Sequence, residues 1–175
     1  MVFSTWKPPP PSFLKVNFDG SALDGGMRGG VGFVIRGPYF RAVAAGGCQL
    51  FDTSILEAEL RAAWAGLRHA RVVLQASSII LEDDSATVIG WIQRGSRGEG
   101  TDHPLIRNIV MMMRDEEAIQ TKHVFREANG AADWMAAYAA HHSRYALWSE
   151  EGELPLTLRE LLYFDLIGCI RTRTV

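Results

Sequence analysis

Four carboxylates in four different local contexts are the residues of this chain that could do chemistry. Asp19 ends one apolar stretch, and Asp84 follows another. Glu59 lies early in a strongly helical segment, and Asp133 lies just inside a second one. Carboxylates at such positions can converge in space, and a converged cluster needs cations because like charges at close range repel. Oxygen ligands favour Mg²⁺ or Mn²⁺ over zinc, and a pair of such ions promotes displacement at phosphorus.

Composition is compatible with one globular domain. The chain has 175 residues, is 47% apolar and carries 18 basic against 20 acidic residues, a formal net charge of −2. This net charge does not indicate nucleic-acid binding, whereas that of a strongly basic domain would. Two distant cysteines indicate neither a disulfide framework nor a zinc site, so we expect an intracellular, reducing location, in the nucleus, the cytoplasm or an organelle. No apolar run has the length of a membrane span or a signal peptide, so no membrane partner is expected.

Short strands and glycine turns organise the first third of the chain. Residues 1–12 contain four consecutive prolines and are predicted to be an extended lead-in. Strands are predicted over residues 13–19, 31–36 and 39–45. Paired glycines and a Gly-Pro step separate these segments, which indicates an antiparallel meander.

Helices and strands alternate in the rest of the chain. The predicted helices cover residues 57–71, 85–93, 104–117, 129–140 and 155–167, and the predicted strands cover residues 77–81 and 121–126. The pattern predicts an α/β fold with a five-stranded mixed sheet flanked by helices. We expect a domain over residues 13–142, with residues 143–175 forming a docked amphipathic helix and a tail.

Two pairs of neighbouring acids compete for the same roles. Glu57 and Glu59 differ by about 200° in direction around a helix, so only one can face the site. Glu57 has a sufficient role in a capping box with Ser54, which favours Glu59. Asp84 is favoured over Asp83, which would face the opposite way if the strand alternation continued.

The four acids lie in segments that together resemble a known family. Residues 15–21 (Lys-Val-Asn-Phe-Asp-Gly-Ser) resemble the first strand of the type 1 ribonuclease H family. Residues 58–62 (Ala-Glu-Leu-Arg-Ala) resemble its glutamate-bearing helix, and residues 82–85 (Glu-Asp-Asp-Ser) its Asp-Ser motif. Residues 126–133 resemble its closing motif, in which the last aspartate lies seven residues after an arginine. The chain is most similar to plant retroelement-derived ribonuclease H-like domains.

The resemblance implies a ribonuclease H-like fold and hydrolysis of the RNA strand of RNA–DNA hybrids. Two ions, Mg²⁺ or Mn²⁺, would be held by Asp19, Glu59, Asp84 and Asp133. The chain would act as a monomer or as part of a larger parent protein. It lacks the room for the basic helix that bacterial relatives insert between residues 94 and 120, and it has no flexible-loop histidine. An alternative is therefore a module that binds hybrid or double-stranded nucleic acid without turnover.

Other polar and aromatic residues have open roles. Contacts with nucleic acid are predicted for Gly20, Ser21, Ser54, Ser85 and Asn129. The Ser54 hydroxyl could instead be a plain helix cap. Arg126 could hold the scissile phosphate or form a surface ion pair. Trp91 and Trp134 could stack on bases, although core packing is favoured, and His123 is expected to be a packed histidine.

Overall fold

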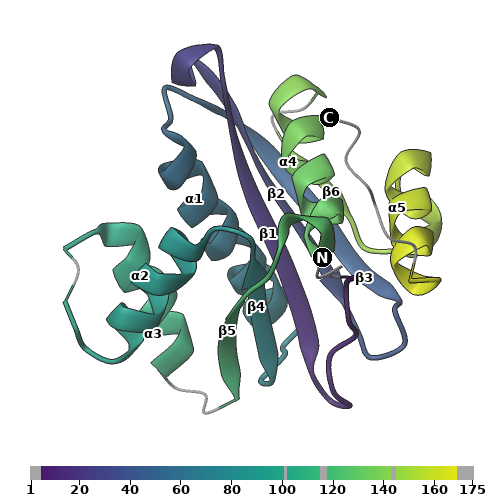
Figure 1. Ribbon diagram of the computed structural model, residues 1–175, viewed down its shortest axis with the longest axis horizontal. Helices are drawn as coiled ribbons and strands as arrows, with labels where there is room; N and C mark the ends of the chain where they lie inside the picture. The colour runs from purple at the N-terminus through teal and green to yellow at the C-terminus, as the bar shows by residue number, and fades with distance from the viewer. Residues whose placement is uncertain (1–4, 101, 115–117, 143–144, 169–175) are drawn as a thin grey trace.

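Six strands form one mixed sheet with helices on both faces (Figure 1). The computed structural model describes residues 5–100, 102–114, 118–142 and 145–168. The strands are β1 (Leu14–Leu23), β2 (Arg28–Arg36), β3 (Ala42–Phe51), β4 (Ile79–Asp83), β5 (Ile119–His123) and β6 (Ala146–Trp148). Their order across the sheet is β5-β4-β1-β2-β3-β6. The predicted ribonuclease H-like α/β fold is confirmed, with one strand more than expected.

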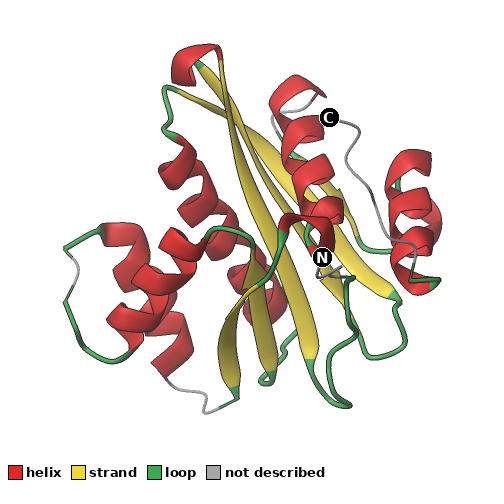
Figure 2. Cartoon of the chain, viewed as in Figure 1, coloured by secondary structure: helices red, strands yellow, loops and turns green. Residues whose placement is uncertain are grey.

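The helices form the two outer layers, as Figure 2 shows around the yellow strands. They are α1 (Ile55–Arg68), α2 (Ala86–Ser96), α3 (Pro104–Arg114), α4 (Gly130–His142) and α5 (Leu156–Leu166). A π-helical turn, His69–Val73, extends α1. The last residues of the predicted helix 104–117 lie outside the described residues. None of the helices described has the length and apolar character needed to cross a membrane.

The sheet combines an antiparallel meander with two parallel strands. β1 pairs with β2 and β2 with β3 in antiparallel registers, whereas β4 runs parallel to β1 and β5 parallel to β4. β1 and β4 pair as far as Asn17 and Glu82, near the carboxyl end of β4, and β1 then continues to Leu23. Asp19 and the residues that end β4 must lie near one another as a result.

The strand boundaries differ from the prediction in most strands. β1 continues to Leu23 and β2 begins at Arg28, whereas the predicted strands covered residues 13–19 and 31–36. β5 runs from Ile119 to His123, so Arg126 lies in the 3₁₀ turn that follows and not in the predicted strand 121–126.

β3 continues to Phe51 because it pairs with β2 along almost its whole length, whereas the predicted strand ended at residue 45. The sixth strand, β6, is only three residues long and pairs with Ala45–Gly47 of β3. Three residues are too few for an alternating pattern to indicate a strand.

Each face of the sheet has its own apolar core. One core joins α1, α2 and α3 to alternate residues of the sheet, including Val16, Phe18 and Leu81. The other joins α4 and α5 to Val34 and Ala45 of the meander. Residues between Val16 and Phe18 on β1 therefore face α4, so the odd-numbered side chains Lys15, Asn17 and Asp19 lie on the α4 side.

Glycines let two helices approach the sheet closely enough to bring their acids to its edge. A Cβ at Gly20 would collide with the backbone of α1 at Glu59. A Cβ at Gly32, the residue paired with Asp19, would collide with the backbone of α4 at Ala136. The absent side chains thus set the spacing between sheet and helices, and with it the positions of Glu59 and Asp133.

Adding a methyl group at Gly32 should push α4 away from β2. We expect Gly32→Ala to lower the free energy of unfolding by about 1–3 kcal/mol, the usual cost of overpacking. Urea denaturation followed by circular dichroism measures it. Gly90→Ala is the matched control, because Gly90 lies within α2 with open space around its Cα. It should be neutral or stabilising by up to about 1 kcal/mol; equal effects of the two changes would contradict close packing at Gly32.

Candidate active site

Three aspartates converge where β4 ends beside the middle of β1. One carboxylate oxygen from each of Asp19, Asp83 and Asp84 lies within 4.8 Å of the others. The backbone N–H of Gly20 donates a hydrogen bond to Asp19 Oδ1 (2.8 Å), which orients the first carboxylate. This donor set contains only oxygen and carries negative charge, so it fits a hard divalent cation such as Mg²⁺ or Mn²⁺.

Asp83 belongs to this cluster, contrary to the prediction that it faces away. Its side chain is fully buried, with Oδ1 accepting from Asn129 Nδ2 (3.1 Å) and Oδ2 from the Ser85 N–H (3.2 Å). The strand alternation ends at Asp83, the last residue of β4, so it does not determine the direction of Asp84. Both carboxylates can therefore approach Asp19. No sequence signal separates this case from a strand that continues.

Glu59 approaches the aspartates from α1. It is buried, and its Oε2 has no hydrogen-bond partner among the described residues. Glu57 lies on the exposed side of the same helix, where it receives two hydrogen bonds from Arg61 (3.1 and 2.8 Å). An orphaned buried carboxylate oxygen beside other carboxylates is costly in the absence of a cation. The unsatisfied atom supports metal binding at this point.

Asp133 lies in the first turn of α4 and is paired with Arg126. The Arg126 Nη2 donates to Asp133 Oδ1 (3.1 Å), and both side chains are about half exposed. Arg126 belongs to the short 3₁₀ turn Arg126–Ala128 between β5 and α4. The ion pair between Arg126 and a neighbouring acid, one of the two predicted roles, is thus present. It also holds a guanidinium at the mouth of the site.

Burial and mutual repulsion make the cluster hold protons. Burial chiefly, and then the charges of Asp84 and Asp133, raise the pKa of Asp19 to about 8. Burial, followed by the charges of Asp19 and Glu59, raises the pKa of Asp83 to about 9. The pKa of Glu59 is raised in the same way, while a hydrogen bond with Ser85 opposes the change. A divalent cation would relieve the same repulsion that protons relieve here.

The residues predicted to contact nucleic acid are engaged within the protein. Ser54 caps α1 by accepting from the Glu57 N–H (3.1 Å), and Ser85 caps α2 by accepting from the Val88 N–H (3.3 Å). The Ser21 hydroxyl donates to the Ala136 carbonyl (3.3 Å). The backbone of Gly20 packs on α1, and Asn129 is buried. The plain cap role of Ser54 is present, and the predicted contacts with nucleic acid stay predictions.

The aromatic candidates divide between core and surface. Trp91 packs against the core beneath α2 and is partly buried. Trp134 is also partly buried: it packs against the core on the α4 side of the sheet and stacks on Tyr138 with ring centroids 5.0 Å apart, so the favoured core packing is present for both tryptophans. The prediction of a packed His123 is wrong, because this side chain is exposed, with Nε2 3.1 Å from the Asp84 carbonyl oxygen. His123 occupies the last ladder position of β5, which is the edge strand of the described sheet, so no further strand of that sheet covers it.

A buried polar network that sequence reasoning missed supports the site from below. The Asn129 Nδ2 donates to the Phe18 carbonyl (2.9 Å) as well as to Asp83. Its Oδ1 accepts from Asn17 Nδ2 (3.1 Å), which also donates to Glu82 Oε1 (3.1 Å). Glu82 in turn pairs with the buried ammonium of Lys15 (2.9 Å). Alternating polar residues on a strand ordinarily indicate a face in contact with solvent. The sequence pattern of β1 therefore does not reveal that Lys15 and Asn17 are buried.

Comparison with known proteins assigns the chain to a family. Residues 17–139, which include all the acids of the cluster, match the reverse transcriptase-like family. This chain is a ribonuclease H-like domain of that family. The domain is 30% identical over 179 aligned positions to an Arabidopsis thaliana protein named as a candidate ribonuclease H protein. That alignment covers 97% of the domain but only 27% of the relative.

Solved structures share the fold of the domain. RNase H1 from the halophilic archaeon Halobacterium salinarum is 25% identical, with a TM-score of 0.59 over 73% of this chain and 96% of that one. The N-terminal RNase H domain of a Mycobacterium tuberculosis protein, solved as a fusion with maltose-binding protein, is 24% identical. It has a TM-score of 0.62 over 73% of this chain and 93% of that one, and shows the fold alone.

The raised pKa of Asp19 predicts that the metal-free domain loses stability as pH rises. Between about pH 4 and 8 the folded state keeps a proton that the unfolded state releases, so each step upward favours unfolding. The slope from one such group is at most about 1.4 kcal/mol per pH unit. Urea denaturation in a chelator from pH 5 to 9 measures this slope, which Asp19→Asn should flatten.

Asp24→Asn is the matched control for this experiment. Asp24 is exposed and paired with Arg28 at the surface (2.6 Å), so its replacement should leave the slope unchanged. Saturating Mg²⁺ should also flatten the slope in the unmodified domain, because cation binding replaces proton binding. A stability that rises between pH 5 and 9 in the chelator would contradict the protonated cluster.

Proposed function

We propose that this domain hydrolyses the RNA strand of RNA–DNA hybrids in a reaction that depends on Mg²⁺ or Mn²⁺. The observation that carries the proposal is the carboxylate cluster of Asp19, Asp83 and Asp84, with ligand atoms within 4.8 Å of one another. It lies at the carboxyl edge of parallel strands in a ribonuclease H-like domain, beside Glu59 and Asp133. The archaeal structural relative is itself an RNase H1.

Two ions would be held by Asp19, Glu59, Asp84 and Asp133. Asp84 is a better ligand than Asp83, because both Asp83 oxygens already accept hydrogen bonds from Asn129 and Ser85. The Asp84 carboxylate makes no hydrogen bond within the described ranges. Bound divalent ions supply a water that is deprotonated near neutral pH and a counter-charge for the leaving oxygen.

The remaining residues of the site orient these ligands and face the substrate. Asn129 donates a hydrogen bond to Asp83 and another to the Phe18 carbonyl, which fixes the backbone of β1 next to Asp19. Arg126 carries a permanent positive charge at the mouth of the site and can receive the scissile phosphate when Asp133 turns to a cation. Recognition of RNA requires contacts with 2′-hydroxyls across its shallow minor groove. Gly20 and Ser21, which directly follow Asp19, would make these contacts.

Cleavage of a hybrid tests the proposal directly. Purified domain, a hybrid labelled on its RNA strand, and Mg²⁺ or Mn²⁺ should give RNA fragments with 5′-phosphates. Asp19→Asn should reduce the rate by several orders of magnitude, because it removes a charge next to both proposed ions. Glu57→Gln is the matched control on the exposed face of α1 and should keep nearly full activity.

Three results would count against this function. No cleavage above buffer with either metal, combined with retardation of the hybrid in Ca²⁺, would make the domain a binding module without turnover. Absence of both cleavage and retardation at low salt would remove nucleic acid as its ligand, because phosphate contacts are strongest there. Loss of cleavage in Glu57→Gln with retention in Glu59→Gln would overturn the assignment of the glutamate.

Replacing Arg126 should affect turnover and leave metal binding almost unchanged. The guanidinium stays charged at neutral pH and is neither a ligand nor a base, so it acts through its field on the phosphate. We expect Arg126→Ala to reduce the maximal rate by about 10- to 10³-fold, the range for loss of one electrostatic donor. Titration of Mg²⁺ at saturating hybrid separates the alternatives. An unchanged maximal rate with a shifted metal midpoint would instead show that Arg126 tunes the metal ligands.

A further inference from the structure

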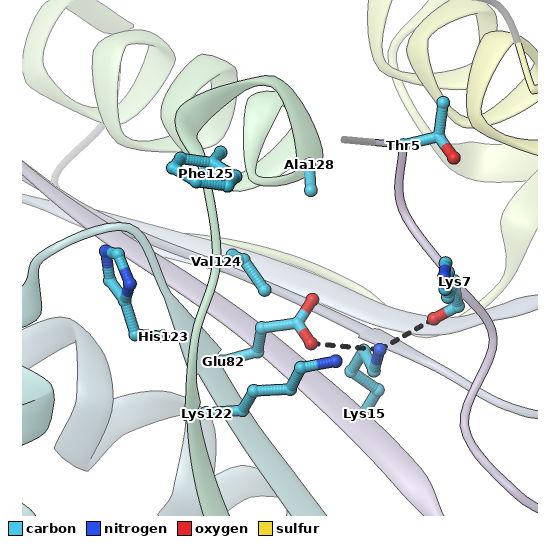
Figure 3. A pocket seen from close by; sticks show the side chains of 9 residues that line it. All are labelled: Thr5, Lys7, Lys15, Glu82, Lys122, His123, Val124, Phe125 and Ala128. Atoms are coloured by element: carbon cyan, nitrogen blue, oxygen red, sulfur yellow. Dashed lines mark hydrogen bonds and ion pairs between the residues drawn. The ribbon is translucent and has the colours of Figure 1, made fainter. Parts of the chain in front are cut away.

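A basic pocket lies beside the candidate active site, on the α4 side of the sheet. It has a volume of about 200 Å³ and is bordered by Lys7, Lys15, Glu82, Lys122 and Phe125 among others. Figure 3 shows Val124 and Phe125 on one side, Thr5 and Lys7 on the other, and Glu82, Lys122 and Lys15 between them. We call this feature the lysine pocket. It is formed where the N-terminal segment crosses the half of the sheet that α4 leaves uncovered.

The charges of the lysine pocket favour an anion. The buried Lys15 ammonium is held by Glu82 (2.9 Å) and donates to the Lys7 carbonyl (2.6 Å), so this pair is nearly neutral. Lys7 and Lys122 are exposed, and in the described part of the chain their ammonium groups have no ion pair or hydrogen bond. Two uncompensated positive charges therefore border one small concavity.

The charge of Lys122 is directed into the same space as that of Lys15. The pKa of Lys15 is lowered chiefly by burial, and the charge of Lys122 acts in the same direction, against the attraction of Glu82. An anionic group in the pocket would relieve this repulsion between ammonium groups, in the same way that a cation would relieve the aspartate cluster.

The pocket is within reach of a strand that passes through the active site. Lys15 precedes Asp19 by four residues on β1, a distance of about 13 Å at ~3.3 Å per residue. His123 and Phe125 border the pocket from the segment that leads from β5 to α4. The His123 Nε2 is 3.1 Å from the Asp84 carbonyl oxygen, and its ring contacts Phe125 edge to face at 6.3 Å. Phe125 is 57% exposed, so much of its ring is open to solvent.

The size of the pocket selects a single strand over a duplex. A volume of about 200 Å³ accepts a phosphate with part of its sugar, whereas a double helix can only lie across the surface. A positively charged groove beside an exposed aromatic ring is the arrangement that binds single-stranded nucleic acid, with the phosphate in the groove and the base on the ring.

We propose that the lysine pocket binds a phosphate of an unpaired nucleotide flanking the hybrid, with its base stacked on Phe125. This inference rests on the proposed function, since it assigns a place to the strand that continues beyond the paired segment. It implies that the domain prefers hybrids that carry a single-stranded tail on one side of the cleavage site.

Binding of matched hybrids with and without a tail tests the inference. Fluorescence anisotropy in Ca²⁺ compares a blunt hybrid with hybrids that carry an unpaired tail on each strand end in turn. One tail should tighten binding about fivefold or more, the low end of the gain from one base–aromatic stack. Phe125→Ala should remove this gain and Phe125→Trp should keep it. Lys122→Ala should also reduce the gain. It should make the slope of log K against log[salt] for the tailed hybrid shallower by about 0.7, the value for one phosphate contact of a single strand.

Arg159→Ala is the control, because Arg159 is an exposed basic residue on α5, away from the pocket. It should leave the gain from the tail unchanged. Equal affinity for blunt and tailed hybrids, or a gain that survives both Phe125→Ala and Lys122→Ala, would overturn the inference. Either result is distinguishable from failure of the proposed function, which is decided separately by cleavage of the blunt hybrid.

Discussion

The amide of Asn17 is the junction on which the positions of the other elements depend. It is completely buried and uses its full hydrogen-bonding capacity: Oδ1 accepts from Trp6 Nε1 (2.8 Å) and Arg36 Nη2 (3.2 Å), and Nδ2 donates to Glu82 and Asn129. Those four partners come from the N-terminal segment, β2, β4 and the start of α4. Buried polar groups in such a network are favourable only when every member is satisfied, so none of these elements can shift independently.

At the candidate active site, this rigid support holds carboxylates together although their charges repel one another. Asn129 accepts a hydrogen bond from Asn17 and donates to Asp83 and to the Phe18 carbonyl. These bonds fix the backbone of β1 from which Asp19 extends. Close packing at Gly20 and Gly32 brings two helices and their acids to the same edge. The carboxylates are thus held together by contacts made elsewhere, and the free energy stored in their repulsion is available to a binding cation.

Much of the fold, and two of the three aspartates of the cluster, Asp19 and Asp84, follow from the sequence, because local signals for them are strong. Glycine turns indicate the meander, and the Ser54–Glu57 spacing indicates the start of α1. The helical period places Glu59 and Glu57 on different faces. Other features depend on contacts between distant segments. Asp83 joins the cluster through Asn129, and Lys15 and Asn17 are buried because Trp6 and Glu82 cover them. A strand pattern cannot distinguish such a covered polar face from one in water.

The pairing of Arg36 with the C-terminal helix has a consequence for where the folding unit ends. Arg36 is fully buried, lies 3.7 Å from the ring centroid of Trp6 and forms an ion pair with Asp165 of α5 (2.6 Å). Trp6 and Asp165 both lie outside residues 17–139, the span of family similarity. A fragment cut to that span would leave a guanidinium in the interior with its carboxylate and its aromatic cover removed, which costs several kcal/mol. We therefore expect a fragment limited to residues 17–139 to be less stable than the whole chain.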